Sequence, residues 1–113
     1  LGLPHNIATM ISRDVAILHP QGINNGSVEL VQFVGATGSD LSSRAKPRNL
    51  GVSALRFPVE NLDHSLSILH KRHVKIASGP VELNLLPYGS IRIAGFDTPD
   101  GVRLEVFEIT EKK

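Results

Sequence analysis

The sequence predicts an α+β fold, and three observations carry this prediction. Residues 51–110 contain one run of leucines at helical spacing, which follows one strand-like run and precedes three more. Residues 1–34 contain strand-like runs with no helical run before them. Glu29 and Glu105 each interrupt an apolar strand-like run, so the second half of the chain resembles a repeat of the first.

Runs rich in β-branched residues predict strands at 6–12, 14–19 and 28–34. Residues 35–50 are rich in Gly, Ser and charge without an apolar period, which predicts a linker. A further strand is expected at 52–59, with Pro58 at its end or at an edge position. The helix is expected at 60–74, with Asn61 or Asp63 as its cap. The segment 74–78 then leads into predicted strands at 80–86, 90–96 and 102–109, with turns at SGP, PYGS and DTPDG.

Composition excludes several classes of protein. The length of 113 residues predicts one domain, and twelve basic against eleven acidic residues lack the positive charge typical of nucleic-acid binders. The absence of cysteine excludes disulfides, thiolate metal sites and a cysteine nucleophile. No run has the length of a membrane helix and no signal-peptide pattern opens the sequence. We therefore expect a cytoplasmic protein with neither nucleic-acid nor membrane partners.

The spacing of the two glutamates also predicts the organisation of the first unit. If Glu29 and Glu105 are equivalent, a second unit that starts near residue 51 implies that the first lacks its opening strand and helix, roughly 25 residues. Such a unit would expose an unpaired strand edge beside apolar side chains. We therefore predict a homodimer with the strand at 52–57 or at 28–34 at or near the subunit contact.

Four stretches carry a resemblance to a known family: LGLP, VELVQF, FPVENLDHSLSILHKRHV and above all FDTPDGVRLEVFE. With them the chain resembles the vicinal oxygen chelate superfamily, which includes glyoxalase I, bleomycin-resistance proteins and extradiol dioxygenases. The resemblance implies paired βαβββ modules that form a curved, incomplete barrel around a small-molecule cavity. In this chain 1–34 would be a truncated first module, 35–50 a linker and 51–110 a complete second module, all within one glyoxalase-like domain.

The resemblance also implies a pattern of metal ligands, commonly His, Glu, His and Glu, from the first and last strand of each module. Glu29 and Glu105 fall at the last-strand positions, but Ala54 falls at the first-strand position of the second module and cannot ligate. The expectation is therefore no cofactor, and the alternative is a divalent ion such as Zn, Ni, Mn or Fe on Glu29 and Glu105. Gly95 stands where the dioxygenase signature has a tyrosine, which disfavours that activity.

The two embedded carboxylates need a partner or water. Strand alternation over 52–57 places Arg56 on the same face as Ala54, so we hypothesise that Arg56, together with Arg92, pairs with Glu29 and Glu105 where relatives hold a metal. The alternative is that the glutamates are solvated in an open half-barrel. His73 stands where the family has glycine just past the helix, which predicts an awkward backbone conformation there.

Two functions stay open at this point. The first is a metal-free protein that binds a small, amphipathic organic ligand without turnover. The second is a glyoxalase-like lyase or isomerase whose missing ligands come from another segment or another chain. Residues expected to line the ligand site combine apolar and charged types: Glu29, Val31, Phe33, Ala54, Arg56, Arg92, Phe96, Glu105 and Phe107.

Overall fold

The computed structural model describes residues 11–19, 26–35, 38–39, 43 and 52–111, and the chain divides into two compact units, Leu1–Ser39 and Asp40–Lys113. In the first unit, β1 (Arg13–Leu18) pairs with β2 (Val28–Phe33) as an antiparallel ribbon in which Val15 faces Val31. Of the strand predicted at 6–12, residues 6–10 lie outside the described part, while Ile11 and Ser12 precede β1. Most of the predicted linker at 35–50 also lies outside it.

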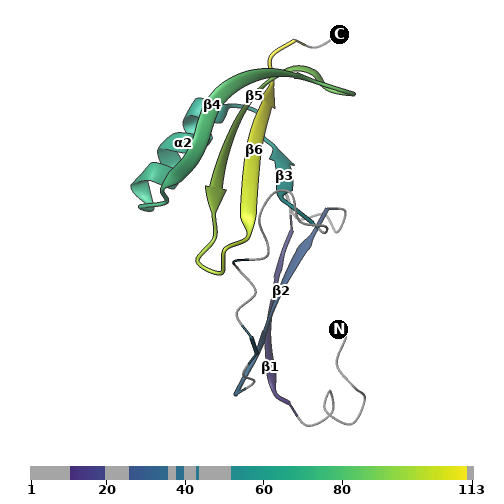
Figure 1. Cartoon of the computed structure of the whole chain (residues 1–113), viewed down its shortest axis with the longest axis vertical. Coiled ribbons are helices and arrows are strands. Elements are labelled where there is room, and N and C mark those ends of the chain that lie inside the picture. Colours follow the sequence, from purple (N-terminus) through teal and green to yellow (C-terminus); the bar gives the residue numbers. More distant parts are fainter. Residues whose placement is uncertain (1–10, 20–25, 36–37, 40–42, 44–51, 112–113) are drawn as a thin grey trace. The chain divides into compact units, whose positions relative to one another are not determined.

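The second unit is a four-stranded sheet with one helix (Figure 1). In chain order its elements are β3 (Leu55–Pro58), α2 (Leu62–Lys71), β4 (Ile76–Leu85), β5 (Gly89–Asp97) and β6 (Arg103–Ile109). The strand order is β3-β6-β5-β4, with β3 parallel to β6 and the other pairs antiparallel. This βαβββ unit, whose curved sheet does not close into a barrel, confirms the predicted α+β fold class.

The helix covers one face of the sheet and is fixed there by its first turn. Asn61 is the N-cap, and its side chain accepts a hydrogen bond from the backbone N–H of His64 at 2.8 Å. Leu62 is completely buried against Ala94 of β5 and Val106 of β6. Burial of such a side chain contributes about 1.5–3 kcal/mol, so Leu62 is a main anchor of α2 on the sheet.

The opposite face of the sheet has no helix from the described residues, and here it is called the open face. Residues that face each other across a strand pair share a face, so Ile93 and Phe107 lie together on this side and Ala94 and Val106 on the helix side. Ile91, Ile93 and Phe107 form a second buried cluster on the open face. The inner strand β5 contributes apolar side chains to both faces, Ile91 and Ile93 to the open face and Ala94 and Phe96 to the helix side.

Two elements differ from their prediction. The strand predicted at 52–59 begins only at Leu55, so Ala54 precedes it; β3 is an edge strand and Pro58 ends it, as expected. The turn predicted at SGP is instead a bulge inside one strand, β4, where the pairing register shifts between Ser78 and Val81. Gly79 sits in this bulge with φ +82°, a conformation that glycine adopts without steric cost.

The predicted awkward conformation after the helix is confirmed. His73 has φ +60°, and it is the one non-glycine residue with positive φ among those the structure describes. Its N–H bonds to the carbonyl of His70 at 2.9 Å, and the N–H of Val74 bonds to that of Leu69 at 3.0 Å. These two bonds form the Schellman motif, which normally has glycine at this position.

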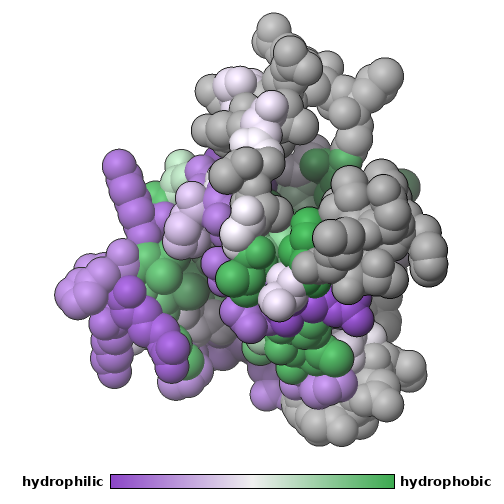
Figure 2. Space-filling model, turned by 90° about the horizontal axis from the view of Figure 1, so that it is seen from below, coloured by the Kyte–Doolittle hydropathy of each residue, from purple (hydrophilic) through white to green (hydrophobic). Residues whose placement is uncertain are grey.

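Apolar side chains also reach the surface of both units. Figure 2 shows hydrophobic patches bordered by hydrophilic side chains, and the exposed large residues include Ile17, Leu30, Val52, Val81 and Leu83. None of the described helices has the length and apolar character needed to cross a membrane.

We predict that His73→Gly stabilises the second unit by about 1 kcal/mol, because glycine adopts the left-handed conformation without the Cβ penalty that histidine bears. The melting temperature should rise by about 4–8 °C. Lys71→Gly, in the last helical position, is the control and should lower it, since glycine there loses backbone entropy. A lower melting temperature for His73→Gly would contradict this account of the helix end.

We predict that Gly79→Ala destabilises the sheet by about 2–4 kcal/mol. A Cβ atom at this position would lie 2.5 Å from the backbone oxygen of Ile93, and the positive φ adds strain. Gly38→Ala is the matched control, because a Cβ there meets nothing within 4 Å. Urea denaturation of both variants measures the difference, and equal stability would show that β4 can shift to make room.

Candidate functional site

The side chains on the open face change from charged to apolar along the direction of the strands. One end carries charged and polar side chains from β3, β5 and β6: Arg56, Asp97, Arg103 and Glu105. The other end is apolar and includes Ile91, Ile93 and Phe107, with Val81 and Leu83 of β4 beside them. One continuous surface therefore offers a charged end and an apolar end.

At the charged end, Arg56 and Glu105 form an ion pair that follows from the strand register. Arg56 is the parallel partner of Glu105, and its Nε donates a hydrogen bond to the Glu105 Oε2. The Glu105 side chain is 20% exposed, whereas that of Arg56 is 49% exposed. The part of the hypothesis that pairs Arg56 with Glu105 is therefore confirmed, and the part that concerns Glu29 stays a prediction. The Glu105 carboxylate is screened on one side by a guanidinium that still reaches solvent.

Sequence reasoning missed a second ion pair next to the first. Arg103 and Asp97 face each other across the β5–β6 hairpin, with Nη2 of Arg103 3.1 Å from Oδ2 of Asp97. Hydrogen bonding from Arg103 lowers the pKa of Asp97, and the same bond raises the pKa of Arg103, to which the nearby charge of Glu105 adds a smaller contribution. The hairpin turn at DTPDG could have revealed this pair, since it sets which residues lie opposite one another.

Arg92 was expected to pair with Glu29 and Glu105, and Phe96 to line the same ligand site, but the structure places both on the other side of the sheet from Glu105. Glu105 faces Gly95 across the β5–β6 pair, so the neighbouring positions of β5 point to the helix side. Phe96 packs there against the cluster around Leu62.

Arg92 instead ties α2 to the sheet. Its guanidinium donates two hydrogen bonds to the carboxylate of Asp63, at 2.9 and 3.0 Å, and lies 3.9 Å from Glu108. The hydrogen bonds from Arg92 lower the pKa of Asp63. Glu108 in turn accepts a hydrogen bond from the backbone N–H of Leu62 at 3.0 Å, so this network fixes the start of the helix.

The remaining predicted residues lie elsewhere. Ala54 precedes β3 and is half-buried, so the strand alternation used to align it with Arg56 does not extend to it. Glu29, Val31 and Phe33 alternate along one face of β2 in the first unit. Their part in a ligand site stays a prediction.

At the apolar end, Phe107 is nearly fully buried and its ring packs against Tyr88. The two ring centroids are 5.1 Å apart at an interplanar angle of 52°, a tilted arrangement favourable for aromatic pairs. Tyr88 is 46% exposed, so it forms the solvent side of this contact.

The expectation of no cofactor, and the alternative of a divalent ion on Glu29 and Glu105, stay predictions, because the two glutamates lie in different units of the chain. Within the described part of the chain, His, Cys, Asp and Glu side chains do not gather in groups of three or more that could hold an ion. The Glu105 carboxylate accepts a hydrogen bond from Arg56, and a divalent cation placed beside it would be repelled by the guanidinium.

Comparison with solved structures identifies proteins of similar fold. A glyoxalase family protein from Bacillus cereus matches 91% of this chain and 67% of its own length, at 22% identity and a TM-score of 0.69. An integron cassette protein from V. cholerae matches 90% of this chain and 78% of its own, at 23% identity and a TM-score of 0.57. A protein from the mobile metagenome of V. pseudocholerae matches 91% of this chain and 78% of its own length, at 21% identity and the same TM-score of 0.57.

These likenesses establish a glyoxalase-type fold for the chain. No protein-family model and no curated protein sequence matches it.

We predict a weak energetic coupling between Arg56 and Glu105, of roughly 0.5–1 kcal/mol, because the guanidinium is half-exposed to water. A double-mutant cycle with Arg56→Gln, Glu105→Gln and both together, measured by urea denaturation, gives the coupling. Both single variants should remain folded. Loss of folded protein on Glu105→Gln alone would mean that the pair is a structural element and that its place on the open face is incidental.

Proposed function

We propose that the open face of the four-stranded sheet binds a small amphipathic organic molecule, without a metal and without turnover. The observation that carries the proposal is the pairing of Arg56 with Glu105 next to an apolar surface on the same face. Ligand sites are typically apolar with a few polar groups that fix orientation. The open face has this composition.

The ion pair supplies both kinds of hydrogen-bonding group. Among contacts with the described residues, Arg56 donates through Nε to Glu105, and its two terminal nitrogens have no hydrogen-bond partner. Those nitrogens can donate to an oxygen of a ligand, while the free lone pairs of Glu105 can accept from a hydroxyl or amide. Arg103, beside Glu105, adds a second guanidinium held in place by Asp97.

The apolar end would hold the body of the ligand. Val81 and Leu83 are about half-exposed and lie beside the buried Ile91 and Ile93, to which they are paired across β4 and β5. A hydrophobic group laid over them would remove apolar surface from water at a gain of about 25 cal/mol per Å². The ligand is therefore expected to be long enough to reach from Leu83 to Arg56.

A second function has one observation in its favour, the fold shared with a protein named for the glyoxalase family. In that case a lyase or isomerase reaction would use a divalent ion whose ligands come partly from another segment or chain. Such a site would require Arg56 to leave Glu105, so metal binding separates the two proposals.

The test is a screen of small amphipathic compounds by two-dimensional NMR on the full chain. Compounds that bind as proposed shift the amides of β5 and β6. We expect Glu105→Gln and Arg56→Gln each to weaken a confirmed compound by about tenfold, in keeping with the loss of one charge-assisted hydrogen bond. Glu82→Gln is the matched control. Glu82 lies opposite Arg92 in the register of β4 and β5, so its side chain is on the helix side of the sheet.

The metal arm uses calorimetry with Mn²⁺, Zn²⁺ and Ni²⁺. Stoichiometric binding that Glu105→Gln abolishes would overturn the metal-free proposal and support the lyase or isomerase. Compounds that bind without disturbing β5 and β6 would place the ligand site elsewhere.

A further inference from the structure

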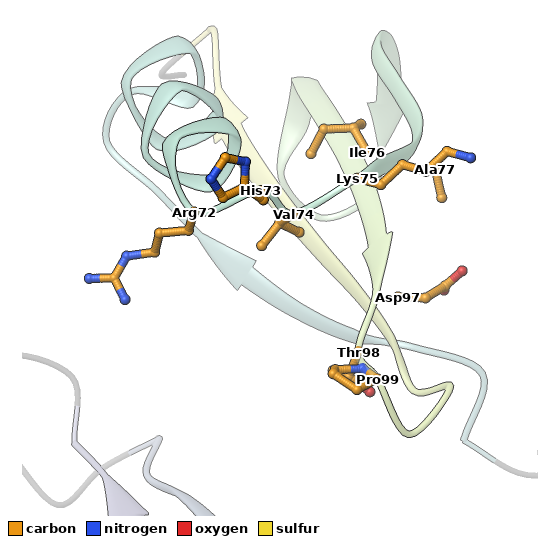
Figure 3. A pocket seen from close by; sticks show the side chains of 9 residues that line it. All are labelled: Arg72, His73, Val74, Lys75, Ile76, Ala77, Asp97, Thr98 and Pro99. Carbon is orange, nitrogen blue, oxygen red and sulfur yellow. The ribbon is translucent and has the colours of Figure 1, made fainter.

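A groove of about 670 Å³ lies at the end of the second unit where the chain leaves α2. Figure 3 shows one wall made by the segment that follows the helix and the other by the end of β5 and the turn after it. The volume is in the range of small-molecule sites. The lining consists of Arg72, His73, Val74, Lys75, Ile76, Ala77, Asp97, Thr98 and Pro99.

The side chains that line this groove include more unpaired positive charges than negative ones. Arg72 and Lys75 form no ion pair with any described residue, whereas both oxygens of Asp97 are already bonded to Arg103. In Figure 3, the side chains of Arg72 and Lys75 extend in opposite directions, with His73 and Val74 between them. One wall therefore carries two uncommitted positive charges at separate places, and the opposite wall combines the polar Asp97 and Thr98 with the apolar Pro99.

His73 provides an independent observation. It holds a left-handed backbone conformation at φ +60° that glycine would adopt at lower cost, and it lines the groove. The Schellman motif accounts for the positive φ at this position, and strained backbone conformations of this kind cluster at functional sites. The helix dipole explains the basic residues of the last turn, His70 and Lys71, but not Lys75 beyond the helix end.

We propose that this groove binds a small organic anion with an apolar body. Arg72 and Lys75 attract the acidic group, His73 donates or accepts a hydrogen bond, and Val74, Ile76 and Pro99 contact the apolar part. The proposal rests on cations other than those of the ligand site on the open face, and Asp97 is the residue that the two sites share.

The test titrates the full chain with 1-anilinonaphthalene-8-sulfonate, followed by dye fluorescence and by two-dimensional NMR. Its uncharged analogue, N-phenyl-1-naphthylamine, keeps the apolar body without the acid. We expect amide shifts at 72–77 and 97–99, and weaker binding of the uncharged analogue. Shifts confined to residues 89–96 and to β6, or equal affinity for the two dyes, would overturn the proposal.

Charge-removing variants locate the acidic group. The double variant Arg72→Gln, Lys75→Gln should raise the dissociation constant of the sulfonate dye by about three- to tenfold, as two exposed charges allow. The control double variant Lys71→Gln, Arg13→Gln makes the same change in net charge outside the groove lining and should leave binding nearly unchanged. If both double variants weakened dye binding equally, the effect would come from the net charge of the protein, and the proposal would be overturned.

His73→Gly tests whether His73 contacts the ligand or only ends the helix, because its expected effects on the melting temperature and on dye affinity are opposite. The variant should melt at a higher temperature and yet bind the dye several-fold more weakly. A higher melting temperature with unchanged binding would overturn the role of His73 in the groove.

Benzoate and phenyl phosphate test which acid the groove accepts. Displacement of the dye by either one supports an anion site and identifies the preferred group. Displacement by neither would overturn it. None of these outcomes depends on Arg56 or Glu105, so the two sites succeed or fail separately.

Discussion

The parallel pairing of β3 with β6 is the constraint on which the rest of the second unit depends. Two parallel neighbours need a crossover connection, and here α2 and the β4–β5 hairpin occupy the chain between them. The same register places Phe57 beside Val106 on the helix side and Arg56 beside Glu105 on the open face. One set of backbone hydrogen bonds thus determines both the packing of the core and the charged end of the candidate site.

The two faces of the sheet use charge in different ways. On the helix side, Arg92, Asp63 and Glu108 connect the first turn of α2 to β5 and β6, and Leu62 is buried next to them. On the open face, Arg56, Glu105, Arg103 and Asp97 line the edge of an apolar surface. Exposed ion pairs contribute little to stability, so the second network adds little to the free energy of unfolding.

Local features of the chain were predictable because short stretches of sequence specify them. The N-cap at Asn61 and the helix that follows depend on residues close in the chain. The strained His73 was predicted from the resemblance, which implies glycine at that position. The Arg56–Glu105 pair was also anticipated, although the alternation that led to it was extended to Ala54, which lies before the strand. Arg92 and Phe96 could not be assigned to a face, because that depends on which residue of β5 lies opposite Glu105.

The amino-acid sequence by itself determined the fold class, the βαβββ order of the second unit and the helix boundaries to within a few residues. Hydrophobic periodicity, caps and turn residues act over one or two turns of chain, and they are visible in the sequence. Only the tertiary structure decided the faces of the sheet, the Arg103–Asp97 pair, the bulge at Gly79 and the groove beside His73. These features depend on strand register, and a shift by one residue transfers every side chain of a strand to the other face.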